Sequence, residues 1–186
     1  MARKYKTQLG AIPKIVNNFK PKTSNQNTFY NIIGDEDTQL ILCHGIAGTG
    51  KTYVSIYKAL QDILRRGTPY NKLIIINPTV DVGNEDKLGF LPGELSAKIQ
   101  QYNESTFTIL DKIIGKDKAT KMISDGKLEI GVLNFLRGVN LENCYVILDE
   151  AQNVSPMQIK TLMTRISEDC KMIIQGDMSQ CDKFKA

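Results

Sequence analysis

The sequence lacks the cysteine patterns that mark zinc sites and disulfide frameworks. Its four cysteines are scattered along 186 residues without any CxxC pair, so we expect incidental thiols in a reducing compartment. It also has no stretch that approaches the ~20 apolar residues of a membrane span, and the basic N-terminus has no apolar run of a signal peptide. These absences predict a cytoplasmic protein that does not cross a membrane.

Acidic residues are absent from positions 1–34, which hold six basic side chains. The whole chain has 24 Lys and Arg against 20 Asp and Glu, so its positive excess lies entirely in this segment. A basic arm can attract nucleic-acid phosphates, and a merely solvated tail is an equal alternative. We assign residues 1–24 to the arm and residues 25–186 to one domain, because the length suits a single compact domain.

Short β-branched segments alternate with helix-like segments along the rest of the chain. The apolar runs show little polar alternation, which is typical of strands covered on both faces. They lie at 40–43, 73–76, 128–133, 145–148 and 172–174, and the helix-like stretches lie at 51–66, about 94–114, 116–124 and 156–166. This order predicts an α/β fold with helices on both faces of a mainly parallel sheet of about five strands.

The segment GIAGTGKT at 45–52 fits GxxxxGK[ST] and lies between a predicted strand and a predicted helix. Glycines let backbone amides approach phosphate oxygens, and the start of the helix adds unpaired N–H groups. Lys51 would reach the β- and γ-phosphates, and the Thr52 hydroxyl would bind Mg²⁺. The residues expected at the nucleotide are Gly45, Ile46, Ala47, Gly48, Thr49, Gly50, Lys51, Thr52 and Tyr53.

Carboxylates follow the predicted strand at 145–148. Asp149 would complete the Mg²⁺ shell, because ligands of open α/β sheets bind at the carboxyl ends of the strands. Glu150 would orient and deprotonate a water that attacks the γ-phosphate. Such a base is typical of hydrolases, whereas a small-molecule kinase must exclude water.

A second polar turn, GDMSQ at 176–180, follows the last predicted strand. Its side chains would emerge at the same edge of the sheet as Asp149. Gln180 could therefore sense the γ-phosphate, and an ordinary turn is the alternative.

Together these segments resemble the PhoH family of P-loop ATPases, whose core is similar to the first motor domain of superfamily-one helicases. The resemblance extends over about residues 21–182 and implies a RecA-like P-loop NTPase, a three-layer sandwich. The matching segments are PKTSNQ at 21–26, GIAGTGKT at 45–52, LGFLPGEL at 88–95, NFLRG at 134–138, ILDEAQN at 147–153, MTRI at 163–166 and GDMSQCD at 176–182.

The resemblance implies roles for three glutamines. Gln26 aligns with the glutamine that reads the adenine edge, which would favour ATP over GTP; an ordinary loop amide is the alternative. Gln152 would join Glu150 in positioning water or would couple the nucleotide to a second ligand. Gln180 would report the γ-phosphate.

ATP hydrolysis by this class usually needs a further cation that stabilises the transition state. Arg137 is the first candidate and Arg165 the second, although Arg165 could simply cap a helix end. A single motor domain has no second domain to close the site, so we expect a homo-oligomer, such as a hexameric ring, in which a neighbouring subunit supplies the arginine.

Departures from the family pattern bear on the partners. Asn77 and Pro78 stand where the family commonly has Arg-Pro, which weakens a role in binding single-stranded RNA or DNA. The family core also continues beyond GDxxQxD, so we expect either a naturally short protein or a truncated piece.

The sequence thus predicts Mg²⁺-dependent binding and hydrolysis of ATP, with single-stranded nucleic acid as a candidate work surface. One alternative is an ATP-binding switch with little turnover that controls partner binding. Another is a phosphotransferase, which would need an arginine-rich lid, and residues 70–135 contain no arginine-rich insertion.

Overall fold

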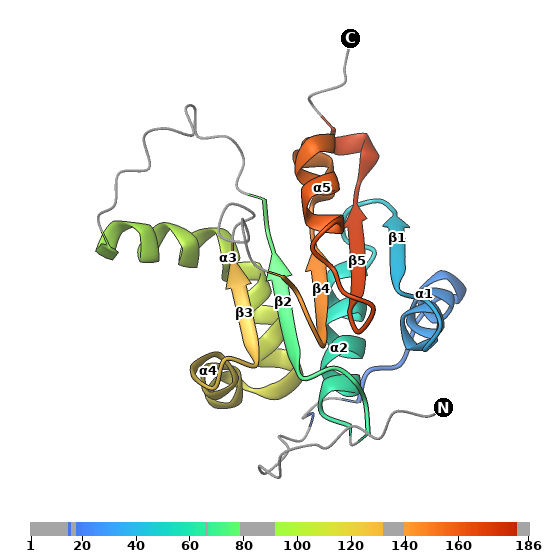
Figure 1. Cartoon of the computed structure of the whole chain (residues 1–186), viewed down its shortest axis with the longest axis horizontal. Coiled ribbons are helices and arrows are strands. Elements are labelled where there is room, and N and C mark those ends of the chain that lie inside the picture. Colours follow the sequence, from blue (N-terminus) through green and yellow to red (C-terminus); the bar gives the residue numbers. More distant parts are fainter. Residues whose placement is uncertain (1–14, 16–17, 66, 79–91, 132–139, 182–186) are drawn as a thin grey trace.

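Among the described residues, five strands form one sheet in which all neighbouring strands are parallel. The computed structural model describes residue 15 and residues 18–65, 67–78, 92–131 and 140–181. Its strands are β1 (Leu40–His44), β2 (Lys72–Ile76), β3 (Leu128–Gly131), β4 (Cys144–Leu148) and β5 (Lys171–Gly176). The sheet order is β1-β5-β4-β2-β3 (Figure 1), which confirms the predicted parallel sheet.

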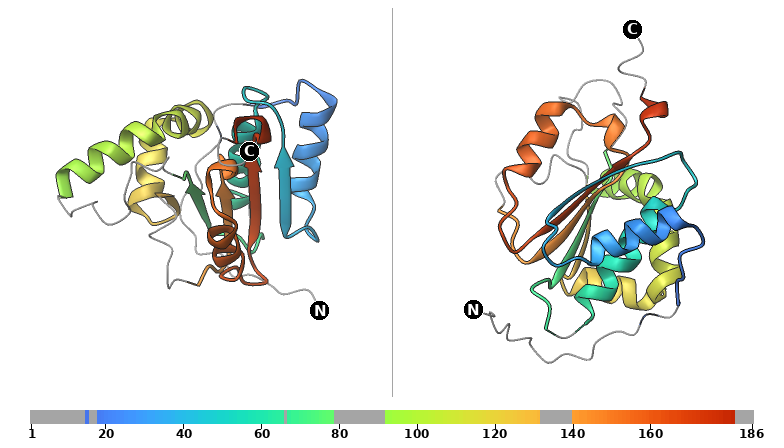
Figure 2. Two further views of the ribbon diagram at one scale, coloured as in Figure 1. Left: turned by 90° about the horizontal axis from the view of Figure 1, so that it is seen from above. Right: turned by 90° about the vertical axis from the view of Figure 1, so that its right-hand side faces the viewer.

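Helices cover both faces of this sheet. Four of them, α1 (Ser24–Gly34), α2 (Lys51–Ile63), α3 (Pro92–Ile114) and α4 (Lys116–Ser124), lie on one face, and α5 (Pro156–Met163) lies on the other (Figure 2). The described part of the chain also contains the short 3₁₀ helices η2 (Ala151–Asn153) and η3 (Met178–Gln180). Within the described ranges no helix is both long and apolar enough to cross a membrane. The expected three-layer α/β sandwich is confirmed.

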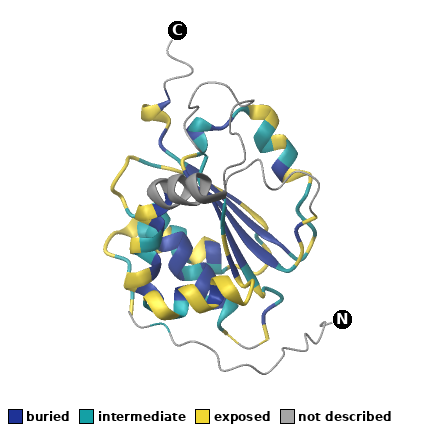
Figure 3. Ribbon diagram, turned by 90° about the vertical axis from the view of Figure 1, so that its left-hand side faces the viewer, coloured by how far each residue is buried: buried dark blue, intermediate teal, exposed yellow. Residues whose placement is uncertain are grey.

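The core is divided into two layers by the sheet, because successive side chains of a strand point to opposite faces. Ile75, Ile147 and Ile173 pack against the layer of α1 to α4, whereas Ile74 and Val146 pack on the face of α5. All five residues of β4 are buried, and Figure 3 shows that much of the sheet is buried. Burial on both faces is the reason that the central strands read as uninterrupted apolar runs.

Helix α1 was not expected from the sequence. Its first turn is polar, and Ile33 is its one fully enclosed side chain among the described residues. Thr23 caps the helix, because its Oγ1 accepts a hydrogen bond from the backbone N–H of Gln26 at 3.2 Å. The helix packs along α2, so tertiary contacts rather than a strong apolar period stabilise it.

Two predicted helices end earlier than expected. Helix α2 ends at Ile63 rather than at residue 66, and α5 ends at Met163 rather than at residue 166. After α5 the backbone pairs with the segment before β4: Leu141 N–H donates to the carbonyl of Arg165 at 2.9 Å, and Ser167 N–H donates to the carbonyl of Leu141 at 3.1 Å. Because these two hydrogen bonds pair the backbone with Leu141, the chain does not continue the helix.

Two other sequence segments lie partly outside the described residues. The predicted strand at 128–133 is seen as far as Gly131. Pro92, in the middle of the LGFLPGEL segment, begins α3, and residues 88–91 and 134–138 fall in the ranges that the structure does not describe.

Phe19, which precedes α1 in the sequence, packs against α2. Its ring centroid lies 5.3 Å from that of Tyr53 and 5.3 Å from that of Tyr57 on α2. The boundary between arm and domain at residue 24 stays a prediction, but this aromatic side chain already belongs to the packing of α2.

A buried carboxylate joins α2 to the centre of the sheet. Asp62 is only 6% exposed, and its two oxygens accept from the Tyr145 hydroxyl at 2.6 Å and from Lys58 Nζ at 2.8 Å. Burial raises the pKa of Tyr145, so the phenol keeps its proton and donates it. Because a buried charge is costly without partners, these contacts allow Asp62 to occupy the interface.

We expect Tyr145→Phe to lower the free energy of unfolding by about 1.5–3 kcal/mol, the usual range for a hydrogen bond to a charged group. Tyr30→Phe is the matched control: its hydroxyl donates to the neutral Gln61 side chain at 2.7 Å in a half-buried position, so its loss should cost less. Urea denaturation of both variants measures the difference. Equal costs would contradict a special role for Asp62.

Candidate functional site

Three polar segments meet at the carboxyl edge of the sheet. The loop of residues 45–50 follows β1, Asp149 follows β4, and Asp177 follows β5. Strand β5 lies between β1 and β4, and the loop is tied to it by the N–H of Gly45, which donates to the carbonyl of Gly176 at 3.2 Å. The structure therefore brings together the segments that the sequence marked separately.

The loop folds around the ammonium group of Lys51. Its Nζ donates to the carbonyls of Gly45 at 2.6 Å and Ile46 at 3.0 Å. Gly48 and Gly50 have φ angles of 79° and 86°, in the left-handed region that strains residues with a Cβ. The glycines therefore make possible the turn that surrounds the lysine before α2 begins.

Thr52 and Asp149 approach each other across the width of β5. Thr52 Oγ1 donates to Asp149 Oδ2 at 2.8 Å, and Asp149 is only 7% exposed. A hydroxyl and a carboxylate are the hard oxygen ligands that Mg²⁺ prefers, and Mg²⁺ normally shares such a pair with nucleotide phosphates and waters. No cluster of three or more His, Cys, Asp or Glu that could hold a metal occurs in the described ranges. The donor set thus fits a metal that arrives with a nucleotide.

Glu150 stands in a strained backbone conformation beside this pair. Its φ of 48° and ψ of 42° are left-handed, which is uncommon for a residue other than glycine. Its carboxylate is exposed and accepts a hydrogen bond from Gln152 Nε2 at 2.6 Å. Gln152 Oε1 in turn accepts from the N–H of Asp177 at 3.0 Å. Gln152 therefore holds Glu150 by linking the ends of β4 and β5.

Asp177 is a site residue to which the sequence analysis gave no role. It is 2% exposed, and its Oδ2 accepts from the N–H of Ala47 in the loop at 2.8 Å. The Ser179 hydroxyl donates to its other oxygen at 2.6 Å, and this contact is the main cause that lowers the pKa of Asp177. These hydrogen bonds favour the charged form of the buried carboxylate. The sequence could have indicated Asp177, because the pair Gly176-Asp177 follows an apolar predicted strand.

Gln175 was also missed. It lies in β5 and its amide donates to Asp149 and to Thr52. The sequence could have indicated this residue, because Gln175 is polar and directly follows the apolar run Met172-Ile173-Ile174.

Gln26 contacts the loop at Thr49. Its Nε2 donates to the carbonyl of Thr49 at 3.0 Å, and its Oε1 accepts from the N–H of Lys22 at 2.8 Å. The glutamine therefore connects the start of α1 with the loop, and its role toward adenine stays a prediction. Tyr53, in the first turn of α2, packs on Phe19 as described above.

Three predicted residues remain, Gln180, Arg137 and Arg165. Gln180 is exposed in η3. Arg137 lies outside the described residues. Arg165 follows the end of α5 and its backbone contacts Leu141, so it lies beside the segment that leads into β4.

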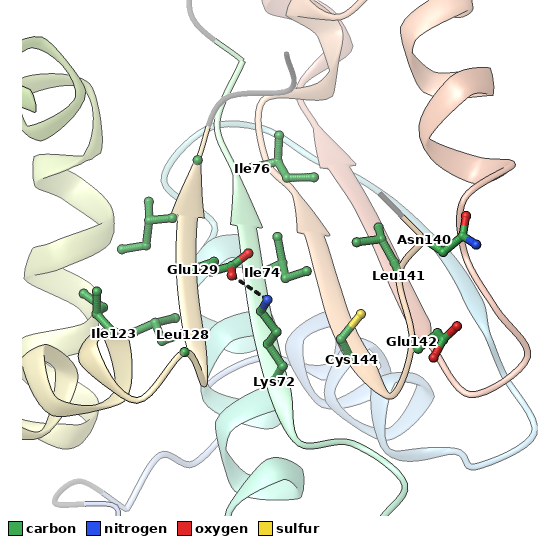
Figure 4. A pocket seen from close by; sticks show the side chains of 13 residues that line it. Lys72, Ile74, Ile76, Ile123, Leu128, Glu129, Asn140, Leu141, Glu142 and Cys144 are labelled. Carbon is green, nitrogen blue, oxygen red and sulfur yellow. Dashed lines mark ion pairs between the residues drawn. The ribbon is translucent and has the colours of Figure 1, made fainter. Parts of the chain in front are cut away.

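A separate pocket of about 560 Å³ lies beside β2 and β3, with the ion pair of Lys72 and Glu129 at 2.5 Å on its wall (Figure 4). Apolar side chains such as Ile74 and Leu128 form most of the rest. No residue of the loop and neither Asp149 nor Asp177 lines it. It is therefore distinct from the site at the carboxyl edge.

Comparison with known proteins places these features in a family. The family described as PhoH-like protein matches residues 18–186. The chain is 40% identical over 161 residues to a PhoH-like protein of Bacillus subtilis (strain 168), and 34% identical over 160 residues to protein PhoH of Escherichia coli (strain K12). These matches cover 87% and 85% of this chain but 49% and 44% of those proteins, so the chain spans about half of their length.

A solved structure shares the fold at low sequence identity. The large terminase from a thermophilic bacteriophage aligns with a TM-score of 0.50 and 12% identity, over 84% of this chain and 39% of that one. This similarity concerns the fold alone. It agrees with the parallel α/β sandwich described above.

The packing around Gln152 yields a test of the site. A Cβ on Gly176 would lie 2.5 Å from Gln152 Oε1 and 3.3 Å from the backbone nitrogens of Ala151 and Gln152. Gly176→Ala should therefore displace Gln152 and lower the free energy of unfolding by about 1–3 kcal/mol. Gly131→Ala is the control, because its Cβ would meet nothing within 4 Å among the described residues.

A double-mutant cycle in urea denaturation separates this clash from a general effect. In Gly176→Ala with Gln152→Ala the short contact is absent, so the two costs should fall short of additivity by about 1 kcal/mol. Simple additivity would show that the Gln152 side chain is not what Gly176 accommodates.

Proposed function

Since the chain belongs to the PhoH-like protein family, we propose that it binds ATP with Mg²⁺ at the carboxyl edge of the sheet and hydrolyses the β-γ phosphoanhydride. The chain spans about half of its relatives, so this proposal concerns the motor domain that the sequence contains. The alternative is a nucleotide-controlled switch with little turnover, which the experiments below distinguish.

The hydrogen bond between Thr52 and Asp149 is the observation that carries the proposal. It joins the last residue of a phosphate loop to the carboxylate at the end of β4, although the two strands concerned are not neighbours. When bound, Mg²⁺ would offset the charge that develops on the β- and γ-phosphates. Thr52 and Asp149 are the residues that would hold it.

Lys51 and the loop amides would bind the triphosphate. The loop already wraps the Lys51 ammonium through two of its own carbonyls, so the cation is held where phosphate oxygens would replace those contacts. The N–H groups in the first turn of α2 would add hydrogen bonds to the phosphate oxygens, and the helix dipole would add to the attraction.

Glu150 would act as the general base. It would accept a proton from a water whose oxygen bonds to the γ-phosphorus while the bond to the ADP oxygen breaks. Gln152 fixes its carboxylate through the 2.6 Å hydrogen bond. In this proposal Gln152 is a positioning residue, and the exposed Gln180 in η3 would sense the γ-phosphate.

Other contacts of the nucleotide and the partners rest on the family resemblance. Gln26 would read the adenine edge beside the loop. Arg137 would supply the completing cation, from a neighbouring subunit of a homo-oligomeric ring. Single-stranded RNA or DNA is the candidate work surface, and the basic N-terminal segment supports electrostatic attraction to it.

We expect Glu150→Gln to keep ATP affinity and to lower the turnover number by about 10²–10⁴-fold, the usual contribution of a general base. Steady-state phosphate release and ATP binding in the presence of Mg²⁺ measure the two effects. Glu168→Gln is the control, since Glu168 is exposed in the turn after α5. Undiminished turnover would remove Glu150 as the base, and tight ATP binding without turnover in the wild-type chain would support a switch.

A shared site predicts that specific ATPase activity rises with protein concentration. Phosphate release is measured across a concentration series while sedimentation reports assembly, with and without single-stranded RNA. Activity that stays constant while the oligomer forms would contradict an arginine supplied in trans.

Mixing inactive Lys51→Ala chains with inactive Arg137→Ala chains tests the donor itself. Partial recovery is expected, because a mixed interface combines an intact loop with an intact Arg137. Recovery that fails although the two variants assemble together would exclude Arg137 as the shared residue.

A further inference from the structure

Gln175 is a fully buried polar residue in the middle of the proposed site. Its exposed fraction is 0%, and it stands in β5 between β1 and β4. Ile173, two positions earlier, packs on the face of α2, and side chains two apart in a strand share a face. Gln175 therefore lies beneath the start of α2, beside the hydrogen bond between Thr52 and Asp149.

The amide nitrogen of Gln175 contacts both proposed metal ligands. Nε2 donates to Asp149 Oδ1 at 2.9 Å and to Thr52 Oγ1 at 3.2 Å. Asp149 Oδ1 also accepts from the N–H of Glu150 at 3.0 Å. Together with the bond from Thr52 to Oδ2, these contacts fix the orientation of the carboxylate.

The amide oxygen of the same side chain is left without a partner. Gln175 Oε1 is buried and makes no hydrogen bond with any described residue. Buried acceptors are nearly always satisfied by protein or water, and an apolar side chain of similar length would fill the same space without that cost. Because Oε1 and Nε2 share one carbon, the free acceptor lies beside Thr52 and Asp149.

We propose that Gln175 is a positioning residue for the nucleotide-bound divalent cation: its amide nitrogen orients Asp149 and Thr52, and its free oxygen accepts a hydrogen bond from a water on the cation. This inference rests on the proposed function of the site. Small hard cations such as Mg²⁺ keep several waters when they bind with a nucleotide, so they bring the donors that this acceptor lacks. Outer-shell hydrogen bonds of this kind tune the affinity of metal sites.

A purely structural role for Gln175 makes a different prediction. If the amide only tied β5 to α2, its loss would weaken nucleotide binding to the same extent with and without metal. If Gln175 acts on the cation, the loss appears only when the cation is present. Metal dependence is therefore the readout that separates the two roles.

The test compares Gln175→Met, which keeps length but removes both hydrogen-bonding atoms, with Gln175→Leu as a second apolar variant. Binding of a fluorescent ADP analogue is titrated in EDTA and in increasing Mg²⁺. We expect affinity in EDTA within about twofold of wild type and an affinity of the ADP complex for Mg²⁺ that is about 10–100-fold weaker. Mn²⁺ in place of Mg²⁺, followed by the EPR signal of the free ion, measures the same loss without fluorescence.

Gln39→Leu is the matched control, because Gln39 is exposed and its amide donates to a backbone carbonyl in the turn before β5. Its Mg²⁺ affinity should equal that of the wild type. Urea denaturation without metal or nucleotide checks that each variant folds. Unchanged Mg²⁺ affinity in a folded Gln175 variant, or an equal loss in EDTA and in Mg²⁺, would overturn the inference. A wild-type chain without any Mg²⁺-dependent nucleotide binding would instead overturn the proposed function, and the inference with it.

Discussion

The site depends on one constraint, that Thr52 and Asp149 must meet although their strands are not neighbours. Strand β5 separates β1 from β4. The hydroxyl of Thr52 at the start of α2 and the carboxylate of Asp149 after β4 therefore form their 2.8 Å hydrogen bond across β5. The residues of β5 and of the turn after it therefore lie inside the site. Gln175 and Asp177 contribute side chains to the site for this reason. Gly176, which lies between them, leaves the space that the Gln152 side chain occupies.

Charge is distributed so that each anion has a defined donor. Asp149 is held by Thr52 and Gln175, Glu150 by Gln152, and Asp177 by the loop and Ser179. Hydrogen bonds from these donors stabilise the ionised form of each carboxylate. The N–H of Ala47 and the charge of Lys51 act on Asp177, and in the proposed function Lys51 would also bind the triphosphate. The described site thus combines anchored carboxylates with the loop that we propose to bind the triphosphate.

The local backbone supports this arrangement. The glycines at 48 and 50 let the loop turn around Lys51, and Glu150, which follows the end of β4 by two residues, has a left-handed backbone conformation. Such strain persists only where the surrounding contacts over-determine it. Here the contacts are the hydrogen bonds of Gln152, which connect β4 with β5. Helices on both faces keep these strand ends aligned.

The sequence by itself determined the alternation of strands and helices, the phosphate loop and the acidic strand end, because apolar periods and glycine spacing are local properties of a chain. It did not reveal α1, whose polar first turn is stabilised by packing on α2, or the early end of α5, where pairing with Leu141 replaces helical hydrogen bonds. The strand order was decided only in the tertiary structure. Gln175 and Asp177 became site residues for that reason, since their contacts join atoms that are far apart in sequence and are brought together by the position of β5.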